Sequence, residues 1–347
     1  MKLWAGIGVI VGLELRQRVR GVAWYVLLGV FVVLIGIVTV LVGLATTSFG
    51  GEDSGGWLYS LIIYFVLMLG TLIAPALSGN AINGEREAGT LATIQVTLVS
   101  ATQIVLGKFL AAWIATLAFL VASSPFLVVA AALGGLSVGT VLVSLLVLAV
   151  ELGVIAAIGV GLSAILGRPL FSIVVSYLAV AALSLGTLIA FGLGGVAIQS
   201  EVKATTVQAV YEDGSDSYTC GPPTVSTYST PRFDFFWPIL SANPYVVLAD
   251  ATPPQFSEYG SPTDLFTGVA SLVRAVQVPP DLSPEFDYCN SATFEPGPSQ
   301  EETYAKTVPS WFVGLLLHLV LAAGALSWAI ARTKTPARKL AVGRRVA

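Results

Sequence analysis

The chain has 347 residues, of which 55% are hydrophobic and only 11% charged, and its formal net charge is −3. A soluble globular protein carries about 25% charged residues, so this composition excludes an ordinary soluble enzyme or binding domain. Most of the chain is therefore expected to contact lipid or other buried helices.

The N-terminal segment is predicted to be an interfacial helix. Its apolar run Leu3–Leu13 precedes the basic cluster Arg16–Arg20, whereas a removable signal peptide has the opposite order. The apolar residues of this segment recur at helical spacing, which is typical of a helix that lies at a membrane surface and leads into the first span.

Six apolar stretches are each long enough to cross a bilayer, which takes about 20 helical residues. The predicted spans are Trp24–Leu44, Leu58–Ser78, Lys108–Leu133, Val138–Leu166, Leu170–Ile198 and Ser310–Ile330. Between the fourth and fifth spans only Gly167-Arg168-Pro169 suits a turn, because proline resists a helix interior and arginine resists lipid. The predicted fold class is an all-α polytopic membrane protein with six transmembrane helices.

The distribution of charge predicts the orientation. With both termini in the cytoplasm, thirteen of the seventeen basic residues fall on the inner side, and sixteen of the twenty acidic residues fall outside. This asymmetry follows the positive-inside rule. We expect a multi-pass protein of the bacterial cytoplasmic membrane, whose basic inner tail contacts anionic lipid and not nucleic acid.

The chain is predicted to have three parts. Residues 1–198 hold the interfacial helix and the first five spans, residues 199–309 form an extracellular domain, and residues 310–347 hold the sixth span and a basic tail. The outer domain contains both cysteines of the chain, Cys220 and Cys289, which predicts a disulfide on the oxidising side of the membrane. The sequence therefore predicts a small, loop-rich cap stapled by this bond.

Two apolar runs within the outer domain are too short to span a membrane. They are Phe233–Leu240 and Asn243–Leu248. Either they dip into the outer leaflet as a re-entrant or interfacial segment, since aromatic side chains favour that depth, or they form the hydrophobic core of the cap.

A short charged run, Asn83-Gly-Glu-Arg-Glu-Ala-Gly-Thr-Leu91, separates the second and third spans. Gly89 breaks the preceding segment and Thr90 can cap a new helix, which is expected near residues 85–99 with an apolar face on the cytoplasmic surface. Such a helix can dock in a groove of a partner protein; the alternative is a solvated loop with internal ion pairs. The residues predicted to contact the partner are Glu85, Arg86, Glu87, Gly89, Thr90, Leu91, Ile94 and Leu98.

The run Glu85–Leu91, followed by Gly107-Lys108, resembles the signature of ABC transporter permeases of the type-2 family. In that family an acidic-Arg-acidic-x-Gly-Thr-Leu stretch follows the second span and a Gly-Lys pair opens the third. The six-span layout is also similar, and Asn243-Pro244 is similar to an Asn/Ser-Pro feature of these permeases. Ala92 departs from the family pattern, which often has an acidic residue there, so one polar contact with the ATPase is in doubt.

The resemblance implies the transmembrane subunit of an ATP-driven, exporter-like complex, in which residues 85–99 form a coupling helix. Two ABC ATPase subunits, carrying ATP and Mg, and a second six-span permease subunit, identical or homologous, are the implied partners. The sequence contains no Gly-x-x-x-x-Gly-Lys-Ser/Thr phosphate loop, so the chain is not expected to be an enzyme or to hold a cofactor. It has no cluster of residues with metal-ligand spacing either. The alternative function is an ATP-independent membrane scaffold or sensor, whose extracellular domain binds a ligand or partner.

Two polar residues inside predicted spans are candidates for a transport path. Glu151 lies near the middle of the fourth span, where a charge costs roughly 2.5–3.5 kcal/mol and often marks function. It either lines a path, takes up a proton, or is a protonated group with a packing role. His318, the only histidine, is expected roughly 8 Å nearer the outer surface, so a direct pair with Glu151 within one copy is not predicted.

Overall fold

The fold is mostly helical. The structure is a computed structural model, and it describes residues 2–48, 55–89, 99–211, 218–289 and 297–334. Among these residues, six helical stretches are long and apolar enough to cross a membrane, as predicted. They are α2 (Val22–Ser48), α3 (Gly55–Ser78), α6 (Ala101–Ala132), α7 (Val138–Ile165), the continuous run Pro169–Ala197 and α14 (Trp311–Thr333).

The third span, α6, begins at Ala101 and not at Lys108 as predicted. The cause is a capping box, in which the Ser100 hydroxyl accepts from the backbone N–H of Gln103 and the Gln103 side chain accepts from that of Ser100 at 2.7 Å. These two bonds satisfy backbone groups that a helix start otherwise leaves without partners. As a result, Lys108 lies within the helix and not at its first residue.

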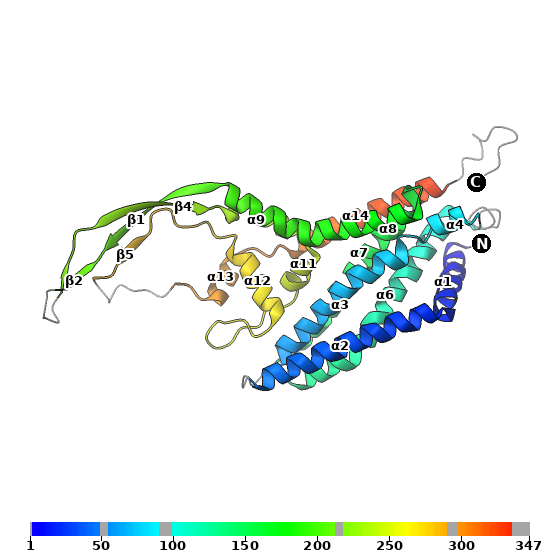
Figure 1. The fold of residues 1–347 in the computed structure, drawn as a ribbon, viewed down its shortest axis with the longest axis horizontal. Coiled ribbons are helices and arrows are strands. Elements are labelled where there is room, and N and C mark those ends of the chain that lie inside the picture. Colours follow the sequence, from blue (N-terminus) through cyan, green and yellow to red (C-terminus); the bar gives the residue numbers. More distant parts are fainter. Residues whose placement is uncertain (1, 49–54, 90–98, 212–217, 290–296, 335–347) are drawn as a thin grey trace.

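The core of the bundle is built around α3 and α7. α7 packs against α14, α3, α6 and the first part of the fifth span, α8 (Pro169–Ala181). The largest buried cluster includes Ile62 and Val66 on α3 with Leu148 and Leu152 on α7. α1 (Leu3–Arg20), α4 (Asn83–Glu87) and the last turns of α14 lie together at one end of the bundle (Figure 1). This end is called the α1 end below.

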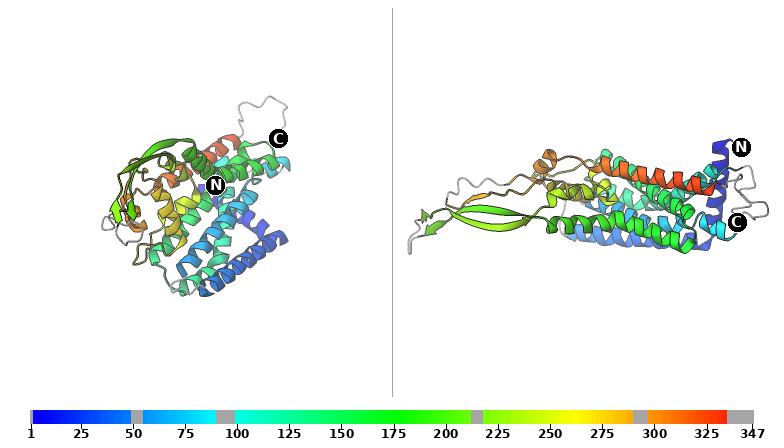
Figure 2. Two further views of the ribbon diagram at one scale, coloured as in Figure 1. Left: turned by 60° about the vertical axis from the view of Figure 1, so that its left-hand side comes forward. Right: turned by 90° about the horizontal axis from the view of Figure 1, so that it is seen from above.

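α1 crosses the α1 end of the bundle at a steep angle to α2 (Figure 2, right). It packs on α6, where Ile7 and Ile10 are buried against Gly107. A Cβ at Gly107 would lie 2.7 Å from the Cβ of Ile10, so only glycine allows this contact. The helix is therefore present as predicted, whereas its place at a membrane surface stays a prediction.

The fifth span is not one regular helix. It follows the predicted turn, because α7 ends at Ile165 and Pro169 occupies the first turn of α8 (Pro169–Ala181). A π-helical turn, η1 (Ala182–Gly186), then separates α8 from α9 (Thr187–Ala197). Such turns leave extra backbone carbonyls and are frequent at functional sites.

Residues 199–309 contain strands, so the expectation of an all-α chain was wrong here. In the described part of this region, β1 (Gln199–Val207) pairs antiparallel with β4 (Thr224–Pro231), from Gln199↔Pro231 to Thr206↔Thr224, and in parallel with β5 (Glu285–Asp287). β2 (Ala209–Tyr211) pairs with β3 (Tyr218–Cys220). Threonine, valine and tyrosine are frequent in these segments and favour strands. The strands form a ribbon that projects away from the bundle (Figure 1), at what is called the ribbon end.

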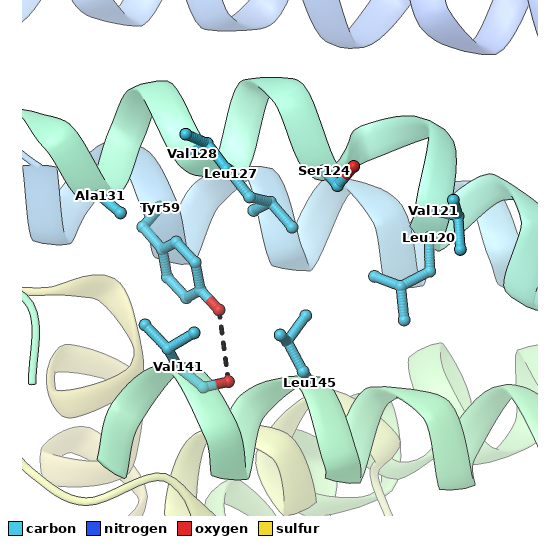
Figure 3. A pocket seen from close by; sticks show the side chains of 9 residues that line it. All are labelled: Tyr59, Leu120, Val121, Ser124, Leu127, Val128, Ala131, Val141 and Leu145. Carbon is cyan, nitrogen blue, oxygen red and sulfur yellow. Dashed lines mark hydrogen bonds between the residues drawn. The ribbon is translucent and has the colours of Figure 1, made fainter. Parts of the chain in front are cut away.

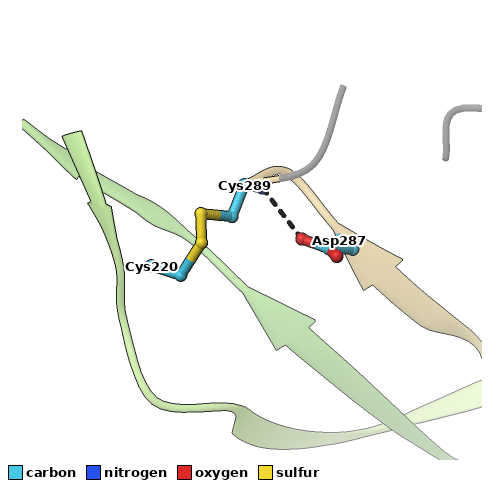
Figure 4. The surroundings of a disulfide bond; sticks show 3 residues. All are labelled: Cys220, Asp287 and Cys289. Carbon is cyan, nitrogen blue, oxygen red and sulfur yellow. Dashed lines mark hydrogen bonds between the residues drawn. A yellow bond between two sulfur atoms is a disulfide. The ribbon is translucent and has the colours of Figure 1, made fainter. Parts of the chain in front are cut away.

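The predicted disulfide is present. Cys220 ends β3 and Cys289 follows β5, and the bond joins them across 69 residues with a Cα–Cα distance of 5.5 Å (Figure 4). The backbone N–H of Cys289 also donates to the carboxylate of Asp287 at 2.9 Å. The bond therefore links the two-stranded sheet of β2 and β3 to the three-stranded sheet of β1, β4 and β5.

Short helices close the ribbon end of the bundle. They are η2 (Phe233–Phe235), α10 (Trp237–Leu240), α11 (Pro244–Ala251), α12 (Leu265–Ala275) and α13 (Gln300–Lys306). α11 packs on α7, α12 and α14, and its Val247 and Leu248 belong to the same buried cluster as Ile62. The run Asn243–Leu248 thus joins the core of the helix bundle, while Phe233 and Phe236 pack on the C-terminal glycines of α9.

Candidate functional site

At the α1 end, a buried lysine forms ion pairs with two glutamates. Lys108 on α6 is 3% exposed, and its ammonium lies 2.5 Å from a carboxylate oxygen of Glu14 on α1 and 2.7 Å from one of Glu85 on α4. A buried cation is stable only when it is paired in this way. The charged run after α3 is therefore fastened, through Lys108, to α1 and α6.

The same run is also attached to the C-terminal end of α7. The hydroxyl of Ser163 accepts from the backbone N–H groups of Ile82 at 2.9 Å and Asn83 at 3.1 Å. The guanidinium of Arg86 donates to the carbonyl of Ala164 at 3.3 Å and to the side chain of Asn83 at 3.2 Å. A cation near the last carbonyls of α7 also interacts favourably with the helix dipole.

A third attachment joins α1 directly to α3. Arg18 donates to the carbonyl of Leu77 at 2.9 Å. Burial lowers the pKa of Arg18, and the nearby carboxylate of Glu14 opposes that shift. These contacts link α1, α3, α4, α6 and α7 to one another.

The predicted partner contacts divide into two groups. The side chains of Glu85 and Arg86 are half-buried and face the bundle, whereas Glu87 and Gly89 are exposed. Gly89 has a φ of +71°, a conformation that other residues adopt at a cost. Thr90, Leu91, Ile94 and Leu98 lie outside the described residues, so the predicted coupling helix is not described.

Glu151 and His318 form a direct pair in the middle of the bundle. Nδ1 of His318 lies 2.9 Å from Oε1 of Glu151, and Nε2 of His318 lies 2.9 Å from the carbonyl oxygen of Ala242. Each of the two side chains is only 1% exposed. The expectation that the two residues lie at different depths was therefore wrong.

The error came from the assumption that the fourth and sixth spans begin at the same depth. α14 begins further into the bundle than α7, because Asp250 on α11 binds its first amides, those of Ser310 at 2.6 Å and Trp311 at 3.0 Å. Further along, a Cβ at Gly161 would lie 2.6 Å from that of Ala325, so the two helices stay in close contact. This offset brings His318 level with Glu151.

Asn243, in the loop between α10 and α11, connects this pair to the π-helical turn. Its amide nitrogen donates to the carbonyl of Ser184 at 2.7 Å and to the hydroxyl of Thr187 at 2.9 Å, and its side-chain oxygen caps α11 at Tyr245. Ala242, which precedes it, holds His318. The segment Ser241–Asn243 thus lies between α14 and the fifth span.

A cavity of about 640 Å³ lies between α3, the fifth span and α11. Its polar side chains are Thr71, Tyr177, Ser184 and Tyr245, and the rest of its lining is apolar. A second cavity of about 330 Å³, between α3, α6 and α7, is almost entirely apolar (Figure 3). There the hydroxyl of Tyr59 reaches that of Ser144 at 3.1 Å.

Sequence reasoning missed a second buried ion pair, at the ribbon end. Nε of Arg274 on α12 donates to Asp250 at 2.6 Å, and the guanidinium lies 3.7 Å from the ring centre of Tyr304 on α13. The two charges are far apart in the sequence, and no spacing rule links them. The Asp250–Arg274 pair, with its contacts to Tyr304 and to the first amides of α14, joins α11, α12, α13 and the start of α14.

No protein-family model matches the chain, and no curated protein is detectably similar to it. Within the described residues, no group of three or more histidine, cysteine, aspartate or glutamate side chains is placed to hold a metal ion. The six apolar helices fit a multi-pass membrane protein. The functional candidates are therefore the anchored charged segment at the α1 end and the Glu151–His318 pair.

Proposed function

We propose that the chain is the membrane-spanning permease subunit of an ATP-driven, exporter-like complex, as its resemblance to ABC permeases of the type-2 family implies. The observation that carries the proposal is the attachment of the charged segment after α3 to α1, α6 and α7 through Lys108, Ser163 and Arg86. A segment that receives force from a motor must transmit it to the membrane helices, and these contacts supply a route.

In this proposal the α1 end faces the cytoplasm of a bacterial cell and the ribbon faces the outside. The energy comes from another chain, because this sequence has no phosphate loop. Two ATPase subunits that bind ATP and Mg dock at Glu87, Gly89 and the residues that follow. A second six-span subunit, identical or homologous, faces this one across the path.

The transported substrate passes near the middle of the bundle. The cavity beside Tyr177 and Tyr245 offers hydroxyl groups within an apolar lining, which suits an amphipathic molecule. Movement of α4 reaches this region through α7, which carries both Ser163 and Glu151. Closure of the ATPase pair thereby switches access between the two sides of the membrane.

Glu87 provides the test, because it is exposed on α4 and makes no ion pair among those described. The chain is co-expressed with each candidate phosphate-loop ATPase found by searching the neighbouring reading frames. Glu87→Arg is expected to weaken co-purification with the ATPase that binds the wild type by about tenfold through charge reversal at the contact. Glu301→Arg makes the same change at an exposed site on α13 and is expected to have no effect.

Glu85→Ala is a poorer choice, since it also removes a partner of the buried Lys108. Normal ATPase binding by Glu87→Arg, or a wild-type protein that never co-purifies with a nucleotide hydrolase, would overturn the proposal.

One observation favours the alternative, a sensor or scaffold that works without ATP. The ribbon carries exposed apolar and aromatic side chains, including Val225, Tyr228 and Tyr288 at 50–66% exposure, and such groups contribute strongly to protein–protein interfaces. Purification of the wild-type protein with its native partners separates the two functions. A partner held by the ribbon, together with the absence of an ATPase, supports the sensor.

A further inference from the structure

The hydrogen bonds of His318 require a proton between this histidine and Glu151. The carbonyl oxygen of Ala242, 2.9 Å from Nε2, can only accept, so Nε2 carries a hydrogen. Nδ1 then faces Oε1 of Glu151 at 2.9 Å. This contact is favourable only if a proton lies between the two atoms, either on the ring as an imidazolium or on the carboxyl group.

Without that proton the same geometry is unfavourable. The lone pair of Nδ1 would face a carboxylate oxygen, and a negative charge would be buried where the side chain of Glu151 is 1% exposed. An unpaired ionised carboxylate in an apolar interior costs several kcal/mol or more. The arrangement described here is therefore that of the protonated pair.

Among the described residues, no other ionisable side chain on the helices packed against this pair supplies the missing charge. Lys108 on α6 is held by Glu14 and Glu85, and Asp250 on α11 is held by Arg274. On α14 itself, Arg332 lies about 21 Å from His318 along the helix. The tyrosines of α3, α8 and α11 are Tyr59, Tyr64, Tyr177 and Tyr245, and each has a hydrogen-bond partner of its own.

We infer that Glu151 and His318 form a proton-binding site whose occupancy sets the position of the segment Ser241–Asn243 and, through it, the shape of the neighbouring cavity. When the pair binds one proton, His318 holds Ala242 in place. When that proton leaves to water, Nε2 keeps its hydrogen, but the repulsion between Nδ1 and Glu151 moves His318 and α14 away from α7, and Ala242 is displaced from its position.

This displacement reaches the cavity through Asn243. The side-chain amide of Asn243 donates to the carbonyl of Ser184 in the π-helical turn at 2.7 Å, and its oxygen accepts from the backbone N–H of Tyr245. Both Ser184 and Tyr245 line the 640 Å³ cavity. Gly314 on α14 also packs against the carbonyl of Ser241, so a shift of α14 displaces the segment Ser241–Asn243 directly. Proton binding thus adjusts the cavity, whether or not an ATPase docks at the α1 end.

The single histidine of the chain makes the site directly measurable. The full-length protein in lipid nanodiscs, with ¹⁵N-labelled histidine, is titrated by NMR between about pH 5 and pH 9. The Nδ1 resonance is expected to shift in one transition, because Nδ1 loses its bridging proton. Over the same transition, amide hydrogen exchange in residues 241–251 is expected to rise about tenfold.

Glu151→Gln separates proton binding from packing. A glutamine amide donates to Nδ1 at every pH, so this variant should keep the protonated arrangement, lose the shift and keep slow exchange. The matched control, Glu87→Gln, alters an exposed glutamate and should titrate like the wild type.

Three results would overturn the inference: a wild-type Nδ1 resonance that does not move, an identical transition in Glu151→Gln, or exchange in residues 241–251 that ignores pH. If Glu151→Gln does not fold, the wild-type titration with its exchange measurement decides alone.

Discussion

Glu85 and Glu151 each contact a basic side chain of the bundle, yet their surroundings differ. Glu85, near the α1 end, keeps 26% of its side chain exposed and contacts a lysine, whose ordinary pKa is far above neutrality. Glu151, with 1% exposure, contacts a histidine, whose ordinary pKa lies near neutrality. The first arrangement is an ion pair that links α4 to α6. The second is the pair that we infer to bind and release a proton.

The largest expected effect comes from removing the permanent cation. Lys108→Met keeps most of the volume of the side chain but removes the cation that contacts the carboxylates of both Glu14 and Glu85. We expect a loss of about 3 kcal/mol in unfolding free energy, discounted for the partial exposure of both glutamates. Denaturant unfolding in detergent measures it. Lys203→Met, at a site 68% exposed, serves as the control, and a loss equal to that of the control would show that the triad is not stabilising.

Matched glutamine substitutions sharpen the comparison. Glu85→Gln removes one charged partner of Lys108 and is expected to cost about 1–3 kcal/mol. Glu151→Gln resembles a protonated glutamate in shape and hydrogen bonding, so its cost is expected to stay below about 1 kcal/mol. Thermal unfolding of the two variants side by side tests this order. A larger loss for Glu151→Gln than for Glu85→Gln would mean that the central pair is a fixed ion pair.

A third buried acid, Asp264, is expected to give the smallest effect on stability when it is substituted. Asp264 caps α12 by accepting from the N–H of Thr267 at 2.7 Å, and it forms no ion pair among the described residues. Burial raises the pKa of Asp264, and hydrogen bonds from Thr267 oppose that shift. The folded state therefore binds this proton more tightly than the unfolded chain. The contribution of this proton to the free energy of unfolding is present below pH 3.8, the ordinary pKa of aspartate, and is lost as the pH rises through the raised pKa of Asp264.

Asp264→Asn removes this titration and keeps a good cap, since asparagine and aspartate cap helices about equally well. We expect the variant to match the wild type within about 0.5 kcal/mol near neutral pH and to depend less on pH between about pH 4 and pH 7. Unfolding curves at several pH values provide the measurement. An unchanged pH dependence would contradict the assignment of the raised pKa to Asp264.

The helices that cross the bundle could be predicted because hydropathy is a sum over neighbouring residues. The turn at Gly167-Arg168-Pro169 and the disulfide between Cys220 and Cys289 also followed from local properties, namely the resistance of proline to helices and the restriction of both cysteines to one segment. The strands β1 and β4 were missed because their pairing joins segments separated by a long connection, which a search for apolar helices does not detect.

The sequence by itself determined the six apolar helices, the turn at Arg168 and the pairing of the only two cysteines. Only the tertiary structure decided which charges meet. Glu151 reaches His318 because a cap on α11, Asp250, sets the depth at which α14 begins. Glu85 reaches Lys108 because α4 folds back onto α6. Depth and rotation of a helix depend on contacts with distant segments, whereas its existence depends on its own residues.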